Sequence, residues 1–512
     1  MRLFKFSFHT QSSDRESYFR TDHLKLDLKV RSARGGLVAL LAQVFKFIIS
    51  MTATVVLARL LTPQDYGIIS MVVVVTGFIA MFKDVGLATA TVQRQEINHQ
   101  QISTLFWINL GLGVAITCLT FLLAPLVAWF YGDPRLTAVT MALAISFIFG
   151  GLLVQHDALL RRQMRFMVLA VIDVFSLLSA PLVAIPLAWS GAGYWALVFG
   201  QLATSVTYAI GVWIACRWRP GPPVRGAGTR SMLSFGANLT GYGVVNYFSR
   251  NFDKFLIGRI WGARQLGLYT RAYQLMLLPI ENLSTPFDGV ALTTLSKLID
   301  SPDRYRRAYQ RLLEKVAILT MPLVALMMAS SDWFVFLILG PQWTETGRIF
   351  ALLALVGLME PITNTVGWLM ISQRRTQEVF RWGIIDATIT GASVIIGLPW
   401  GAVGVAASYS LIGFFVRKQL LIWYVGRAGP VRAADIYRTI APAIYAAIAN
   451  LIILYSFRKS IQLSDPLMGT LLSSAIMLAT TLSVLVILPR GRSMLQDIVN
   501  LVPDVLKMKK TG

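Results

Sequence analysis

The residues of this chain that could do chemistry are isolated charges inside long apolar stretches. Lys46 lies within one such stretch, and Glu281 and Glu360 lie near the middle of two others. A charge at the centre of a bilayer costs about 2.5–3.5 kcal/mol on insertion scales, so it usually faces a cavity or a partner. A lysine in that position could hold an anionic group of a substrate. A carboxylate could take up a proton or sodium ion on one side and release it on the other, and a structural ion pair is the alternative for all three residues.

A second group of charges falls where the chain is expected to reach the outer side of a membrane. The segment "SRNFDKF" places Arg250, Asp253 and Lys254 at positions i, i+3 and i+4, which share one face of a helix, and Arg271 follows at the start of the next apolar stretch. We interpret Arg250, Lys254 and Arg271, with Lys46, as substrate-binding cations. Asp253 is interpreted as an ion-coupling or gating carboxylate. A self-neutralised cluster at a helix end is the alternative.

Lys83 and Asp84 interrupt another apolar run before it ends. We expect them in the last turns of a helix at the cytoplasmic face, where Asp84 either takes part in gating an inner vestibule or is simply solvated. Asp173 and Asp386, each close in sequence to clustered arginines, are expected to be structural clamps at the same face.

Motifs of covalent chemistry are missing from plausible locations. We find no P-loop, HExxH or GxSxG motif there, so no catalytic residue, metal ligand or cofactor is expected, and the chain is predicted not to be an enzyme.

The elements that must position these charges are membrane helices. Of the 512 residues, 55% are hydrophobic and only 14% are charged, whereas about 25% charged residues is typical of soluble domains. The apolar residues form blocks of about 20, the length that crosses a hydrocarbon core of ~30 Å. Because lipid offers no partner to unpaired backbone groups, these blocks must be helices. The fold class is therefore predicted to be an all-α polytopic membrane protein.

About fourteen transmembrane helices are predicted. They cover residues 36–58, 66–87, 104–130, 135–156, 167–188, 193–216, 231–258, 265–294, 316–340, 346–371, 380–398, 401–425, 436–457 and 466–488.

Basic residues predict the orientation of these helices. Most of the 47 lysines and arginines fall in segments that share one side if the N-terminus is cytoplasmic, which agrees with the positive-inside rule and places both termini inside. The net charge of +22 then faces anionic membrane lipids. Nucleic-acid binding is not expected, because no basic soluble domain is present to support it.

An internal repeat divides the chain into halves. Residues 57–70, "LARLLTPQDYGIIS", are echoed by residues 257–270, "IGRIWGARQLGLYT", and further echoes follow in the same order at similar offsets. Each repeat holds six helices, so the halves are parallel repeats about an axis along the membrane normal. We predict the following division: a cytoplasmic N-terminal segment (1–35), a six-helix bundle (36–219), a cytoplasmic linker (220–230), a second six-helix bundle (231–428), two extra C-terminal helices (429–489) and a cytoplasmic tail (490–512).

Several motifs carry a family resemblance. "LARLLTPQDYGIISM", "DVGLATATVQRQE", "WFYGDPRL", "LLRRQMRF" and "GAGYWALVFGQ" resemble segments of the polysaccharide exporters in the multidrug/oligosaccharidyl-lipid/polysaccharide exporter superfamily, and most of all its Wzx-like branch. The resemblance implies two six-helix bundles around a central cavity, alternating access, and a polyprenyl-diphosphate-linked oligosaccharide as substrate. It implies a flippase of the bacterial inner membrane for lipopolysaccharide or exopolysaccharide export, with a polysaccharide polymerase and export machinery as partners.

Other functions remain open on the sequence alone. A cation-coupled multidrug-type antiporter of the same superfamily fits the number of helices, but it would favour acidic and aromatic cavity walls over Lys46 and the outer cations. A membrane-embedded polymerase or glycosyltransferase would need a large outer loop with catalytic carboxylates, and the expected outer loops are short. The coupling ion, a proton or sodium, cannot be read from the residues.

Overall fold

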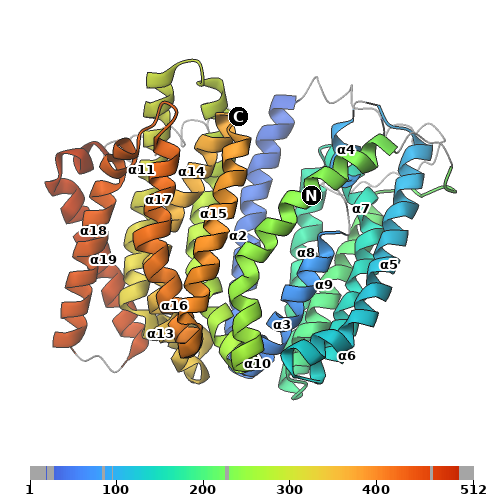
Figure 1. The fold of residues 1–512 in the computed structure, drawn as a ribbon, viewed down its shortest axis with the longest axis horizontal. Helices are drawn as coiled ribbons and strands as arrows, with labels where there is room; N and C mark the ends of the chain where they lie inside the picture. The colour runs from blue at the N-terminus through green and yellow to red at the C-terminus, as the bar shows by residue number, and fades with distance from the viewer. Residues whose placement is uncertain are drawn as a thin grey trace, which may run out of the picture. The chain divides into compact units, whose positions relative to one another are not determined.

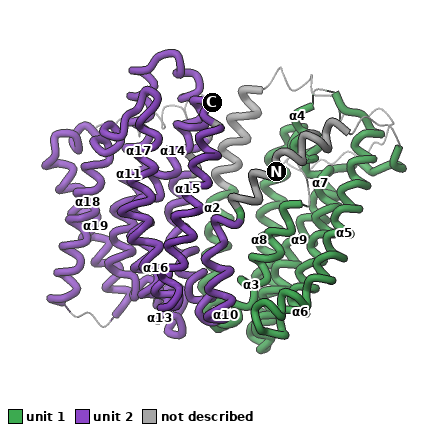
Figure 2. Tube along the Cα trace, viewed as in Figure 1, with its two compact units in different colours: residues 1–247 green, residues 248–512 purple. Residues whose placement is uncertain are grey.

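The chain forms two compact units of helices. The computed structural model describes residue 19 and residues 28–82, 87–94, 96–224, 230–461 and 465–494, and no strand occurs within these ranges. Unit 1 comprises Met1–Tyr247 and unit 2 comprises Phe248–Gly512, as Figure 2 shows. The expected division, with its linker at residues 220–230 between the two bundles, stays a prediction.

Unit 1 is a bundle of membrane-length and shorter helices (Figure 1). Its helices are α2 (Leu28–Leu60), α3 (Pro63–Ala80), α4 (Leu87–Gln93), α5 (His99–Tyr131), α6 (Arg135–Ala144), α7 (Ser146–Arg162), α8 (Phe166–Trp189), α9 (Tyr194–Ala215) and the first part of α10 (Arg230–Lys297). Helix α8 packs along α9 and α2, and α5 packs along α6 and α7.

Unit 2 contains the rest of α10 and the helices that follow it. They are α11 (Pro302–Ala329), α12 (Ser331–Leu339), η2 (Pro341–Trp343), α13 (Thr344–Gly357), α14 (Glu360–Ser372), α15 (Thr376–Gly397), η3 (Leu398–Trp400), α16 (Gly401–Ile412), the π-helical turn η4 (Gly413–Arg417), α17 (Lys418–Gly426), α18 (Ala433–Ser460) and α19 (Pro466–Ile487). Helix α18 packs against α11 and α19, and Figure 1 shows α18 and α19 at one edge of this unit.

The all-α polytopic fold is confirmed, and each expected span overlaps helix. Among the described residues, eleven helical stretches are long and apolar enough to cross a membrane. One of them, Gln377–Gly426, covers two expected spans, while α10, which covers two more, is not among the eleven. The number fourteen therefore stays a prediction.

Two helices differ from the expected spans for local reasons. Helix α10 runs through the expected break between 258 and 265, and only Gly262 interrupts it, at φ 77° and ψ −177°, a region that is essentially restricted to glycine. The expected span 316–340 was displaced, because the helix begins earlier, at Pro302, and ends at Ala329 before α12.

Close helix contacts in unit 1 depend on two glycines. A Cβ at Gly113 of α5 would lie 2.7 Å from the Phe147 carbonyl oxygen, and one at Gly151 of α7 would lie 2.6 Å from the Asn109 carbonyl oxygen. Small residues let helix backbones approach closely in membrane proteins. This contact sets the position of α7, which carries part of the site described next.

Candidate functional site

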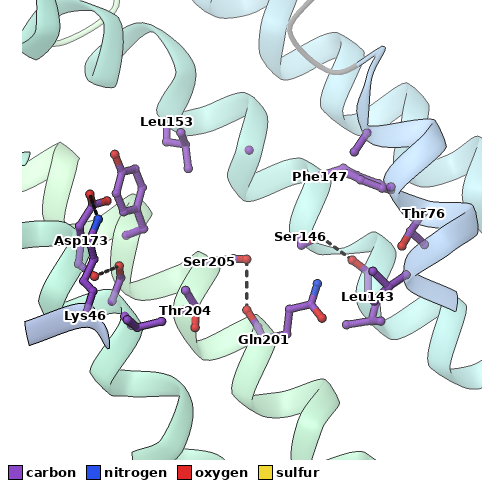
Figure 3. Close-up of a pocket in the computed structure, with 17 residues that line it drawn as sticks. Lys46, Thr76, Leu143, Ser146, Phe147, Leu153, Asp173, Gln201, Thr204 and Ser205 are labelled. Atoms are coloured by element: carbon purple, nitrogen blue, oxygen red, sulfur yellow. Dashed lines mark hydrogen bonds and ion pairs between the residues drawn. The ribbon is translucent and has the colours of Figure 1, made fainter. Parts of the chain in front are cut away.

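A cavity lies among the helices of unit 1 and has a volume of about 570 Å³. Side chains from α2, α3, α6, α7, α8 and α9 line it, as Figure 3 shows. Its apolar lining includes Leu143, Phe147 and Leu153, whereas its polar lining consists of one ion pair, one amide and several hydroxyls. This volume is within the range of about 300–1,000 Å³ typical of small-molecule sites.

The ion pair joins Lys46 of α2 to Asp173 of α8. Lys46 Nζ donates to Asp173 Oδ2 over 3.2 Å, and the two side chains are 31% and 40% exposed. Both residues line the cavity, and Figure 3 shows them together on one side of it. Lys46 thus faces a cavity and also has a carboxylate partner. Both interpretations from the sequence, a cavity-facing cation and a member of an ion pair, therefore apply to this residue.

Asp173 has a different partner from the arginines near it in sequence. Arg161 donates to Asp157, and Arg162 and Arg165 donate to backbone carbonyls. Because these arginines are engaged elsewhere, the carboxylate of Asp173 is left to Lys46. Asp173 thus joins α8 to α2 through Lys46 and not through the arginines near it in sequence, and its role as a structural clamp stays a prediction.

Tyr208 links the cavity to a second hydrogen-bonded group on α7 and α9. Tyr208 lines the cavity, and its hydroxyl donates to Asp157 Oδ1 over 2.7 Å. The same carboxylate accepts from Arg161 Nε at 2.6 Å through Oδ2. Tyr208 is therefore held in place, with its hydroxyl oxygen left as an acceptor.

Glu360 of unit 2 is in a closed environment. Lys418 Nζ donates to Glu360 Oε1 over 3.0 Å, and these side chains are only 6% and 15% exposed, in that order. The neighbouring Arg417 lies 3.7 Å from Asp386 and donates to the hydroxyl of Tyr409 over 3.0 Å. Glu360 is thus a member of a buried charge network, and its role in ion coupling stays a prediction.

Asp253 lies in a second buried group of unit 2. The hydroxyl of Tyr269 donates to Asp253 Oδ2 over 2.8 Å, and the backbone N–H of Lys254 donates to Asp253 Oδ1 over 2.8 Å. Lys254 Nζ donates to Asn251 over 2.9 Å, whereas Arg250 is exposed. The expected cluster therefore separates into a buried carboxylate, a lysine whose ammonium group donates to Asn251, and an exposed arginine.

The remaining predicted residues lie apart from these groups. Arg271 donates to Gln274 over 2.9 Å, and Glu281 is exposed on α10. Asp84 lies outside the described residues. The roles assigned to Arg250, Lys254, Arg271, Glu281 and Asp84 stay predictions.

Sequence reasoning missed Lys418 and the hydroxyl-bearing residues of the cavity. One signal was available for Lys418: the expected span 401–425 contains two adjacent basic residues, Arg417 and Lys418, which require carboxylate partners inside a membrane. No comparable signal marks Gln201, Thr204 and Ser205 of α9, because such residues are common in helices that face a neighbouring helix.

Relatives of known assignment match most of the chain. The lipopolysaccharide biosynthesis protein WzxC of Escherichia coli (strain K12) is 27% identical over 394 residues, covering 76% of this chain and 79% of that protein. The teichuronic acid biosynthesis protein TuaB of Bacillus subtilis (strain 168) is 28% identical over 357 residues, covering 68% of this chain and 74% of that protein.

Solved structures show the same fold. The lipid II flippase MurJ, in an inward closed conformation, aligns with a TM-score of 0.67 at 14% identity over 86% of this chain and 98% of that one. A multidrug resistance MATE family transporter of the MOP superfamily, in an inward-facing conformation, aligns with a TM-score of 0.59 at 12% identity, covering 79% of this chain and 99% of that one. The model of the family described as "Polysaccharide biosynthesis protein" matches residues 56–348, and the chain therefore belongs to this family.

Proposed function

We propose that this protein is a flippase that moves polyprenyl-diphosphate-linked oligosaccharide repeat units from the cytoplasmic to the outer leaflet of the bacterial inner membrane. Transport proceeds by alternating access and serves lipopolysaccharide or exopolysaccharide export. In this proposal both termini of the chain lie in the cytoplasm. The observation that carries the proposal is the polar cavity of unit 1, which presents Lys46 and Asp173 inside a bundle of membrane-length helices. Membership of a polysaccharide biosynthesis family supports the same substrate class.

Lys46 matches the most difficult part of such a substrate. A diphosphate carries negative charge, and moving it unaided through a low-dielectric layer is prohibitive. An ammonium group in a cavity lowers this cost by charge-assisted hydrogen bonds to phosphate oxygens. Lys46 supplies that group, and about a third of its side chain is accessible.

Asp173 neutralises Lys46 when no substrate is bound. While the cavity is empty, its carboxylate neutralises Lys46 at 3.2 Å. An arriving diphosphate competes with Asp173 for the ammonium, and the carboxylate takes the ammonium back when the headgroup leaves. The empty carrier therefore returns without an unpaired charge, which would otherwise be costly inside the membrane.

The test is polymer export in cells that lack the native gene. Lys46→Ala should abolish export while the amount of protein in the membrane stays close to normal, because the side chain is accessible rather than locked in the core. Lys46→Arg should retain part of the activity, since charge matters more than shape for a mobile headgroup.

Lys459→Ala is the matched control, because this exposed lysine lies at the end of α18, outside the cavity. It should leave export unchanged. Full export by Lys46→Ala at a normal protein level would refute the headgroup role.

A further inference from the structure

The hydroxyl groups of the unit 1 cavity all use their protons in the same way. Each of them donates to a backbone carbonyl three or four residues earlier in the chain, over distances between 2.6 Å for Ser146 and 3.2 Å for Thr204 and Ser205. We call this set the hydroxyl lining; its members are Thr76, Ser146, Ser176, Thr204 and Ser205. Their protons are used in these bonds, so each hydroxyl oxygen can offer a ligand only an acceptor.

The same bias extends to the other polar groups. The hydroxyl of Tyr208 also gives its proton away, to Asp157. Gln201 is exposed and contributes an amide, which can both donate and accept. Residues 201, 204, 205 and 208 follow the spacing i, i+3, i+4 and i+7, so a single face of α9 presents them. Figure 3 shows Gln201, Thr204 and Ser205 along this helix, between the ion pair and Ser146.

The part of a ligand that meets the hydroxyl lining must bring many donors and little charge. The lining oxygens are neutral, so they accept hydrogen bonds but offer no counter-ion to a charged group. A metal cation would meet the ammonium of Lys46 in the same cavity, and the two positive charges would repel. The apolar lining residues, Leu143, Phe147 and Leu153 among them, suit the non-polar C–H face of a sugar ring, and sugar hydroxyls supply the donors.

We propose that the unit 1 cavity is a saccharide-binding subsite, in which Gln201, Thr204 and Ser205 recognise hydroxyl groups of the sugar attached to the diphosphate. This inference rests on the proposed function, since it places the sugar beside the headgroup held by Lys46. It also goes further, because it assigns selection of the saccharide to α9. Lys46 binds the charged diphosphate that all these lipids share, and the side chains of α9 recognise the sugar, which differs between them.

The experiment compares two lipids that differ only in the saccharide. The probes are the lipid-linked oligosaccharide extracted from membranes of the producing organism and polyprenyl diphosphate without sugar. Their affinities for the purified full-length protein are measured in detergent. The test variant combines Gln201→Leu, Thr204→Val and Ser205→Ala. The control is Thr388→Val, because the hydroxyl of Thr388 makes the same kind of bond, to Ile384 O over 2.9 Å, but is exposed on α15 outside the cavity.

The triple variant should lose about tenfold or more in affinity for the saccharide-bearing lipid, because a site built to hydrogen-bond hydroxyls loses partners. Its affinity for polyprenyl diphosphate should change less than about twofold, which is below the effect of one lost hydrogen bond. Thr388→Val should bind both lipids as the unaltered protein does. Equal losses for both lipids, or no loss for either, would overturn the proposal.

Two further arms separate this inference from the proposed function and from a cation site. If Lys46→Ala leaves both affinities intact while the triple variant discriminates, the headgroup role fails and the saccharide subsite stands. Replacing choline with sodium at constant ionic strength should change neither affinity. A sodium effect that the triple variant removes would make the lining a cation site and would overturn the inference.

Discussion

The two units contain ion pairs of almost the same length in opposite surroundings. Lys46 and Asp173 of unit 1 lie 3.2 Å apart, with 31% and 40% of their side chains exposed. Lys418 and Glu360 of unit 2 lie 3.0 Å apart, with 6% and 15% exposed. The first pair lines a large cavity that offers other polar partners, while the second is embedded in a buried network.

This difference in access separates an exchangeable contact from a fixed one. Opening a buried pair leaves a charge without water or partner, which is strongly unfavourable. A pair beside an open cavity can trade its partner for water or for a ligand. Residue type alone would have treated Lys46 and Lys418 alike, so their surroundings decide which of them can serve a substrate.

Removing the buried lysine should give the largest effect. Lys418→Met leaves Glu360 as an uncompensated charge, and we expect a loss of about 3–5 kcal/mol in the free energy of unfolding. The measurement is thermal unfolding of the purified protein, together with the amount found in the membrane. The double variant Lys418→Met/Glu360→Leu should recover most of the loss, because neither charge remains. If Lys418→Met were as stable as the unaltered protein, the buried pair Lys418–Glu360 would not be a fixed structural contact, and the contrast with Lys46–Asp173 would fail.

Removing the carboxylate of the open pair should change binding more than stability. Asp173→Asn leaves Lys46 without its competitor, so the Kd for polyprenyl diphosphate should fall, and export should slow because release is impaired. The free energy of unfolding should change by about 1 kcal/mol or less, as is usual for accessible pairs. Weaker binding of the headgroup lipid would contradict the exchange between Asp173 and diphosphate.

The smallest effect is expected at an ion pair that is still more exposed. Arg264 and Glu345 of unit 2 lie 2.7 Å apart, with 60% and 50% of their side chains exposed. Glu345→Gln should shift the free energy of unfolding by about 0–1 kcal/mol, and added salt should reduce that shift further. A cost comparable to that of Lys418→Met would break the link between exposure and stability.

The helices could be predicted from the sequence because their signal is local. Hydropathy and length identify a membrane helix one stretch at a time, and the expected span 104–130 agrees closely with α5 at His99–Tyr131. The position of the break at Gly262 could not be predicted in the same way, because the sequence does not show which glycine of an apolar run adopts a positive φ.

The partners of the site residues could not be predicted, because pairing depends on which helices become neighbours. The place of Lys46 within an apolar stretch indicated a cavity or a partner, and the structure shows both. Its partner Asp173 is 127 residues away in sequence, and neither the sequence of α2 nor that of α8 indicates that these two helices lie side by side. For the same reason Glu360 could be recognised as a buried carboxylate, while Lys418 could not be named as its partner.

The π-helical turn Gly413–Arg417 gives the chain of unit 2 one point at which its length can change by a residue. A π-turn holds one residue more than a regular α-helical turn, and it is seen mainly as an isolated bulge within an α-helix. Deleting a single codon within this turn would remove only the extra residue, so the later side chains of α17, Lys418 among them, would keep nearly their present direction. The same deletion within a regular turn would rotate every later side chain by about 100° around the helix axis.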